Sequence, residues 1–359
     1  MMTVRLQGRL TGSAISIIAR TPLLRRRLLH AAAARGRSLV LCYHTIGPRR
    51  RGEQVIEPIA PELFAAQMRA LREIGDIVPL ASVLTRRSGA RPAFAVTFDD
   101  DDPSHARYAL PVLRELGIEA TFFLSGRSLH GVGAYWWTRL QQSAEELGLE
   151  ETCRRIGHTG RTLEEVARAC RAEAFVRELE TSAALPAMSL SDMRALAEAG
   201  MTIGFHTIRH PLLTKLSRPE LATALIDGRE TLADAVGQDI DYLAYPYGGA
   251  DARVAAMARR LGYRAAFTLG NRPMHASGDP MLVMRWQPGP ATPDRLIAEG
   301  ALRLMLSPRF ELEAAHELPA AIDHPAEIGP NQPRIRVPGG MPRGEIGHRR
   351  DPAAHECAG

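Results

Sequence analysis

Short apolar runs alternate with helix-like stretches through the middle of the chain. Apolar runs that stop at polar or glycine-rich segments are typical of buried parallel strands. We predict such strands at residues 38–43, 93–98, 120–124, 201–205, 242–245, 265–269 and 281–286. Apolar residues spaced three and four apart predict helices between them, at 61–75, 108–116, 189–199, 218–236 and 251–261. The alternation favours an α/β fold with parallel strands, which can close into a barrel.

Two segments do not follow this alternation of strands and helices. Residues 129–187 contain Tyr135-Trp136-Trp137 and then a polar stretch rich in Glu, Arg and Ala, which predicts a helical insertion. Residues 308–359 are rich in Pro, Gly, Arg and His without a period, which predicts a disordered tail. The main domain is therefore expected over residues 38–307.

The net charge of +5 first suggests a nucleic-acid or membrane partner. Residues 1–37, however, hold eight arginines and no acidic residue, whereas residues 308–359 hold six arginines and eight acidic residues. The main domain is therefore close to neutral, which argues against nucleic-acid binding. The N-terminal arm is either a loosely ordered basic extension or an amphipathic segment that makes peripheral contact with anionic lipid.

The cysteines, the single lysine and the length of the apolar runs limit the class of protein and the cellular compartment that we expect. The four cysteines are far apart and form no C-x-x-C pair, which favours a reduced interior over zinc knuckles or a disulfide framework. Lys215 is the only lysine and follows a threonine, which excludes a P-loop. We find no apolar run long enough for a transmembrane helix, and the short run at 14–19 precedes its arginines, the wrong order for a signal peptide. We expect a cytoplasmic protein with possible membrane contact through residues 1–37.

Polar residues capable of chemistry recur just after the predicted strands. Because the carboxyl ends of parallel strands share one face of a barrel, these residues are expected to converge there. They are His44, Asp99, Asp100, His206, His210 and Tyr247.

The spacing of His206 and His210 matches that of metal ligands. Thr207 replaces the glutamate of a zincin helix, and Pro211 disfavours a helix, so we predict a loop that presents two imidazoles. Taken alone, this spacing belongs more often to surface or core histidines. The aspartates at 99–102 either cap a helix or provide a metal ligand and a general base. An aspartate with two histidines is a familiar metal-binding set.

Five motifs in order resemble one known family. They are Thr97-Phe98-Asp99-Asp100, residues 109–113 (ALPVL), residues 120–123 (ATFF), His206-Thr207 with His210-Pro211, and Tyr245-Pro246-Tyr247-Gly248. Together they resemble the polysaccharide deacetylases with a NodB-type domain (carbohydrate esterase family 4), over roughly residues 38–290. The opening Tyr43-His44 resembles the branch in which a usually C-terminal histidine loop comes first, which includes poly-N-acetylglucosamine deacetylases of biofilm synthesis.

The resemblance implies a deformed (β/α)7 barrel and one divalent metal ion, with zinc as the expected metal. It implies that Asp100, His206 and His210 hold the metal. Asp99 would act as the general base toward the attacking water, and His44 as the general acid that protonates the leaving amine. The backbone N–H of Tyr247 would stabilise the oxyanion.

The chain departs from the family pattern at two positions. Asp101 stands where the family usually has glycine, and it could crowd the site or add negative charge. Ala244 replaces an arginine that commonly orients the base, and Arg285 is either its substitute or an ordinary strand-end arginine. Trp136 and Trp137 either pack the insertion onto the main domain or stack on a sugar, and packing is the more frequent role. We expect a hydrolase that removes N-acetyl groups from a polysaccharide or its lipid-linked precursor. The alternatives are a catalytically silent glycan-binding protein and a hydrolase of another non-peptide amide.

Overall fold

The computed structural model describes residues 17–18, 20–49, 52–170 and 187–305. Seven parallel strands form a closed barrel, because β1 pairs with both β8 and β3. The short strand β2 (Asp76–Ile77) pairs with β3 outside the ring. The barrel strands are β1 (Ser38–Tyr43), β3 (Ala93–Asp99), β4 (Thr121–Leu124), β5 (Thr202–Phe205), β6 (Tyr242–Ala244), β7 (Ala265–Leu269) and β8 (Val283–Trp286). The predicted deformed (β/α)7 barrel is confirmed, with small shifts at strand ends.

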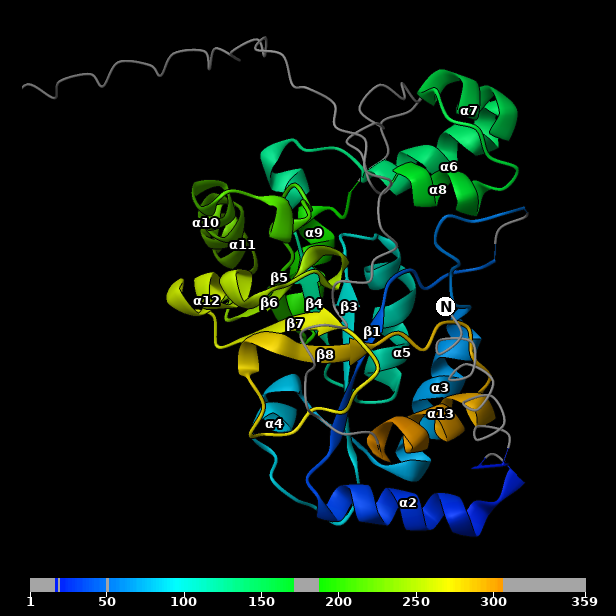
Figure 1. Cartoon of the computed structure of the whole chain (residues 1–359), viewed down its shortest axis with the longest axis vertical. Helices are drawn as coiled ribbons and strands as arrows, with labels where there is room; N and C mark the ends of the chain where they lie inside the picture. Colours follow the sequence, from blue (N-terminus) through cyan, green and yellow to red (C-terminus); the bar gives the residue numbers. More distant parts are fainter. Residues whose placement is uncertain (1–16, 19, 50–51, 171–186, 306–359) are drawn as a thin grey trace, which may run out of the picture. The chain divides into compact units, whose positions relative to one another are not determined.

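Helices surround the barrel (Figure 1). They are α3 (Pro61–Ile74), α4 (Leu80–Thr85), α5 (Leu110–Glu115), α9 (Leu190–Glu198), α10 (Arg218–Ile226), α11 (Arg229–Val236), α12 (Ala252–Arg260) and α13 (Pro293–Met305). Ser189 and Asp192 form the capping box that the sequence indicates at the start of α9. No helix in the described part of the chain is long and apolar enough to span a membrane.

Two predicted helices are wrong in detail. The single helix expected at 218–236 is split into α10 and α11, because Gly228 adopts a left-handed φ of 81° between them. The helix expected at 108–116 begins as a π-helical turn, His105–Ala109, and continues as α5. The pattern of apolar residues does not distinguish these backbone variants from a continuous α-helix.

The helical insertion has a small core of its own. Its helices are α6 (Trp136–Leu147), α7 (Leu149–Ile156) and α8 (Leu163–Cys170). Their buried apolar side chains form a cluster that includes Leu140, Ile156 and Val166. Residues 171–186 of the predicted insertion and the predicted tail at 308–359 lie outside the described residues.

The alternating direction of side chains along each strand determines which residues fill the inside of the barrel. Side chains of every second residue point inward, so Val40, Ala95 and Phe123 pack in an interior cluster with Phe267. The neighbouring strand residues, including Leu39 and Leu41, pack in the cluster that contains the surrounding helices. Near the carboxyl ends of the strands the interior changes from apolar to polar, and the candidate site begins there.

Candidate active site and metal centre

Unusual backbone conformations concentrate at the carboxyl ends of the strands. Among the described residues, four that are not glycine have a left-handed φ: Asp100 (73°), Thr207 (61°), His210 (50°) and Tyr247 (59°). They follow β3, β5 and β6. Each such residue costs of order 1–3 kcal/mol, a cost that proteins retain mainly at functional sites. The loops after these three strands bring the predicted site residues to one face of the barrel.

Asp100, His206 and His210 form a group with metal-site dimensions. One potential ligand atom from each residue lies within 4.8 Å of the others. The Nε2 atoms of His206 and His210 are 3.1 Å apart, and Asp100 Oδ1 lies 3.6 and 3.8 Å from them. All three side chains are buried. The structure thus brings together the three residues that the sequence predicts as metal ligands.

The chemistry of this group fits a divalent cation. Buried Asp100 Oδ1 and His210 Nδ1 have no hydrogen-bond partner. His206 Nδ1 contacts the Ala244 carbonyl oxygen at 2.8 Å, so it carries the proton and Nε2 keeps its lone pair. Burial lowers the pKa of both histidines, and burial together with Asp99 raises the pKa of Asp100. A cation among these atoms would satisfy a carboxylate and two imidazole nitrogens at once.

Arg285 holds the carboxylate of Asp99 next to the metal group. The guanidinium donates to both carboxylate oxygens, at 2.5 and 2.6 Å, and also to the Thr97 hydroxyl at 3.3 Å. Burial alone would raise the pKa of Asp99, but the charges of Arg285 and His206 lower it well below its usual range. Arg285 is therefore a partner of Asp99 across the barrel rather than an ordinary strand-end arginine.

The two departures from the family pattern have structural explanations. Ala244 is fully buried on β6, and Arg285 reaches Asp99 from β8 instead. The Asp101 carboxylate accepts hydrogen bonds from Ser125 N (2.6 Å), Ser125 Oγ (2.7 Å) and Arg127 N (3.2 Å). The loop after β4 thus holds Asp101. Its negative charge still acts on the site, because it contributes to the raised pKa of Asp100.

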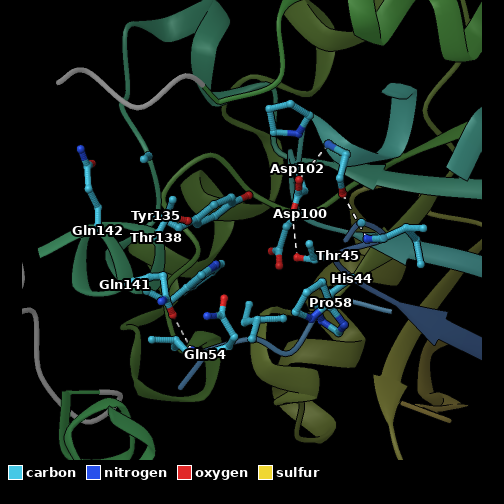
Figure 2. Close-up of a pocket in the computed structure, with 18 of the residues that line it drawn as sticks. His44, Thr45, Gln54, Pro58, Asp100, Asp102, Tyr135, Thr138, Gln141 and Gln142 are labelled. Carbon is cyan, nitrogen blue, oxygen red and sulfur yellow. Dashed lines mark hydrogen bonds between the residues drawn. The ribbon is translucent and has the colours of Figure 1, made fainter. Parts of the chain in front are cut away.

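A pocket of about 570 Å³ opens beside the metal group. Figure 2 shows His44 and Thr45, from the loop after β1, on one side and Tyr135, Thr138 and Gln141, from the insertion, on the other. Asp100 lies between them. The insertion therefore forms one wall of the pocket. In the sequence it is visible only as an interruption of the alternating strands and helices.

The aromatic residues of the insertion pack directly on the metal group. Tyr135 and Trp137 stack with ring centroids 4.3 Å apart, and His210 meets both rings edge-on at 5.5 and 5.1 Å. Trp136 Nε1 donates to the Tyr247 hydroxyl at 3.1 Å. The prediction that these tryptophans pack the insertion onto the barrel agrees with these contacts. Trp137 also lines the pocket, where it is partly exposed.

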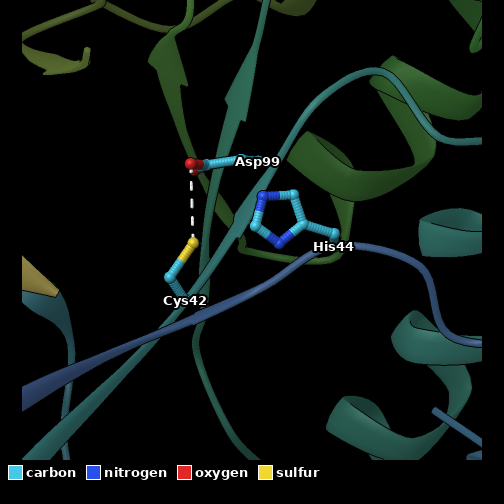
Figure 3. A group of neighbouring side chains, drawn as sticks. All are labelled: Cys42, His44 and Asp99. Carbon is cyan, nitrogen blue, oxygen red and sulfur yellow. Dashed lines mark hydrogen bonds between the residues drawn. The ribbon is translucent and has the colours of Figure 1, made fainter. Parts of the chain in front are cut away.

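Cys42, His44 and Asp99 form a second cluster (Figure 3). The Cys42 thiol donates to Asp99 Oδ2 at 3.5 Å, and burial raises its pKa, so it stays protonated. Because Arg285 already occupies both Asp99 oxygens, we interpret this cluster as a hydrogen-bonded support for the carboxylate. Cys42 is not among the residues predicted for the site, although its spacing of two from His44 could have placed both on one face of the strand.

His44 sits where the pocket meets Asp99. Its side chain is half-buried, and burial lowers its pKa to about 4, so the imidazole is neutral at pH 7. His105 Nε2 contacts the His44 carbonyl oxygen at 2.7 Å, which fixes the loop that carries the imidazole. The π-helical turn after β3 supplies His105 and therefore helps to position His44.

Comparisons with known proteins find relatives of the whole barrel. The chain is 23% identical to the polysaccharide deacetylase-family protein YxkH of Bacillus subtilis (strain 168) over 234 residues, which are 64% of this chain and 63% of that protein. Its fold is similar to that of the Streptococcus pyogenes deacetylase PplD in complex with acetate (TM-score 0.52, 19% identity, 74% of this chain and 98% of that one). It is also similar to BC0361, a polysaccharide deacetylase from Bacillus cereus (TM-score 0.50, 17% identity, 74% and 69%).

The family model called polysaccharide deacetylase matches residues 86–266, which contain β3 to β6 and the motifs that follow them. This segment makes up half of the chain and includes the three residues of the metal group. The chain therefore belongs to the polysaccharide deacetylase family.

Proposed function

We propose that this protein is a metal-dependent hydrolase that removes N-acetyl groups from a glycan. The observation that carries the proposal is the buried Asp100, His206 and His210 group beside an Asp99 carboxylate that Arg285 holds in place. Asp100 of this group and the neighbouring His44 line the pocket between the barrel and the insertion. Family membership supports an acetylated glycan as the substrate, and the nitrogen and oxygen ligands suit zinc.

Asp100, His206 and His210 would hold the metal through one carboxylate oxygen and two Nε2 atoms. Such an ion supplies polarisation of the acetamide carbonyl and a lowered pKa of the attacking water. His206 is already oriented for this role by its hydrogen bond to Ala244. The stack of Tyr135 and Trp137 limits rotation of His210.

The remaining residues would move protons and stabilise charge. Asp99, kept ionised by Arg285, accepts a proton from the attacking water. His44 supplies a proton to the leaving nitrogen, which must be protonated before the C–N bond breaks. A His44 nitrogen lies within 4.8 Å of an Asp99 oxygen, so a proton taken by Asp99 has a short path to the neutral imidazole. The backbone N–H of Tyr247 stabilises the carbonyl oxygen as it becomes negative.

Trp137 is suited to support a sugar ring. One ring face is covered by Tyr135, and Trp137 lines the pocket next to His210. We expect Trp137→Ala to raise KM for an oligosaccharide about fivefold, because aromatic stacking contributes about 1 kcal/mol. Trp137→Phe keeps an aromatic face and should lose much less. An unchanged KM in the alanine variant, with the metal content retained, would assign Trp137 to packing alone.

Acetate release tests the proposed function. The protein, loaded with Zn²⁺, should bind about one ion per chain and release acetate from N-acetylglucosamine oligomers of at least one linkage. Each acetate should appear with one new primary amine. A glycan-binding protein without activity would bind the same oligomers and release nothing. A hydrolase of another amide would release acid only from non-glycan substrates.

A further inference from the structure

Exposed apolar side chains gather at the N-terminal side of α2 (Pro22–Ala34). Among the residues that the structure describes, five large apolar side chains are exposed, and three of them fall within residues 17–24. Leu23 is 76% exposed, Ile17 58% and Leu24 36%. The other two, Leu147 and Ile226, lie singly on α6 and α10. A local group of exposed leucine and isoleucine side chains marks an interaction surface more often than scattered single ones.

The opposite face of α2 holds the helix on the protein. Leu29 and Ala33 are buried, and α2 packs against α13. Arg37, just after the helix, donates to the Leu304 carbonyl oxygen at 2.9 Å. At about 100° of rotation per residue, Leu23 and Leu24 point away from this buried face. The helix is therefore fixed in place and presents its apolar residues to the solvent.

Arginines surround these apolar residues. Arg20, Arg26 and Arg27 are exposed, and Arg25 is half-buried. Within the part of the chain that the structure describes, none of the four pairs with a carboxylate, and the first turn of α2 has no acidic residue. Cations near a helix N-terminus disfavour the helix, because the helix dipole is positive there. This arrangement favours an external anionic partner over a role in stabilising α2.

We propose that residues 17–18 and 20–27 form a surface that docks the protein on an anionic lipid bilayer. The arginines would attract the negatively charged headgroups, and Ile17, Leu23 and Leu24 would enter the interface between headgroups and acyl chains. This combination of charge and exposed leucine distinguishes a membrane from a nucleic acid, because phosphate backbones are bound by charge and hydrogen bonds without such apolar groups.

Docking through this surface would orient the pocket away from the membrane. β1 starts just after α2 and runs toward His44, a length of about 20 Å at 3.3 Å per residue. Figure 1 shows α2 at the end of the barrel opposite α6, which forms the pocket wall. If the proposed function holds, this orientation favours an extended glycan over a sugar held directly at the lipid headgroups.

Vesicle co-sedimentation of the full-length protein tests the surface without any assay of activity. We expect binding to vesicles of phosphatidylcholine mixed with phosphatidylglycerol, weak binding to phosphatidylcholine alone, and release by added salt. Leu23→Glu/Leu24→Glu should weaken binding at least about tenfold, because charged side chains are excluded from the interface. The matched control is Leu147→Glu/Ile226→Glu, which makes the same chemical change at the other two exposed apolar residues and should bind like the wild type.

Each outcome decides the proposal. Circular dichroism melting and acetate release from soluble oligomers should be unchanged in both variants, since neither pair of residues lies at the site. Equal loss of binding in the two double variants would overturn the proposal, as would no binding of the wild type to anionic vesicles. Binding to duplex DNA without binding to vesicles would instead assign the arginines to a nucleic acid. Failure of acetate release in the wild type would leave this result intact, because the vesicle assay does not depend on it.

Discussion

Replacing His206 with alanine should abolish both metal binding and acetate release. His206 offers Nε2 at 3.1 Å from His210 Nε2 and 3.6 Å from Asp100 Oδ1, so its loss leaves only two ligands. We expect metal affinity to fall by roughly 100-fold or more, since loss of even a supporting hydrogen bond to a ligand costs about 10–100-fold. Metal content after equilibrium dialysis against Zn²⁺ measures the effect directly. Full metal occupancy in this variant would refute the assignment of the group.

A variant at the general base separates metal binding from catalysis. Asp99→Asn alone would leave the buried Arg285 without its counter-charge, so the neutral pair Asp99→Asn/Arg285→Met is the better test. It should keep one Zn²⁺ per chain and lose about 10²–10⁴-fold in turnover, the usual contribution of a general base. Metal analysis and acetate release on the same sample distinguish it from His206→Ala. Substantial activity in the double variant would exclude Asp99 as the base.

The second large effect is expected at Arg285. Its side chain is fully buried and makes both of its short contacts to Asp99. Arg285→Ala would leave a buried carboxylate unpaired and should lower the free energy of unfolding by about 3–5 kcal/mol. Turnover should fall about 100-fold, because Asp99 would no longer be held in one orientation. Chemical denaturation and acetate release measure the two effects separately.

Moving the arginine back to β6 provides the control. In Ala244→Arg/Arg285→Ala, the guanidinium would come from the position at which the family resemblance implies an arginine, into the volume that Arg285 vacates. We expect this double variant to recover much of the stability and turnover lost in Arg285→Ala. Ala244→Arg alone should be destabilising, because Ala244 is fully buried and Arg285 still fills the space. No recovery in the double variant would mean that Arg285 does more than pair with Asp99.

The sequence predicted the elements that depend on local patterns. Each barrel strand is a mainly apolar run that stops at or near a polar residue, a glycine or a proline, so its position is visible without a structure. The capping box at Ser189 is likewise local. The sequence did not reveal the helix break at Gly228, because a glycine within a helical pattern does not always end a helix. It also did not reveal α13, because a helix next to a polar tail has no distinctive signal. The motifs identified Asp100, His206 and His210 because each motif is a short stretch of sequence: Asp100 directly follows Asp99, and the two histidines are four residues apart.

By itself, the sequence determined the family, the order of the seven barrel strands, and the residues able to bind a metal. These depend on short stretches of chain, which carry their own chemical pattern. Only the tertiary structure decided that Arg285 holds Asp99, since β3 and β8 are distant in sequence and these two side chains meet inside the barrel. It also decided that Trp137 lies against His210. Such contacts arise from barrel closure and from packing of the insertion, which no local pattern encodes.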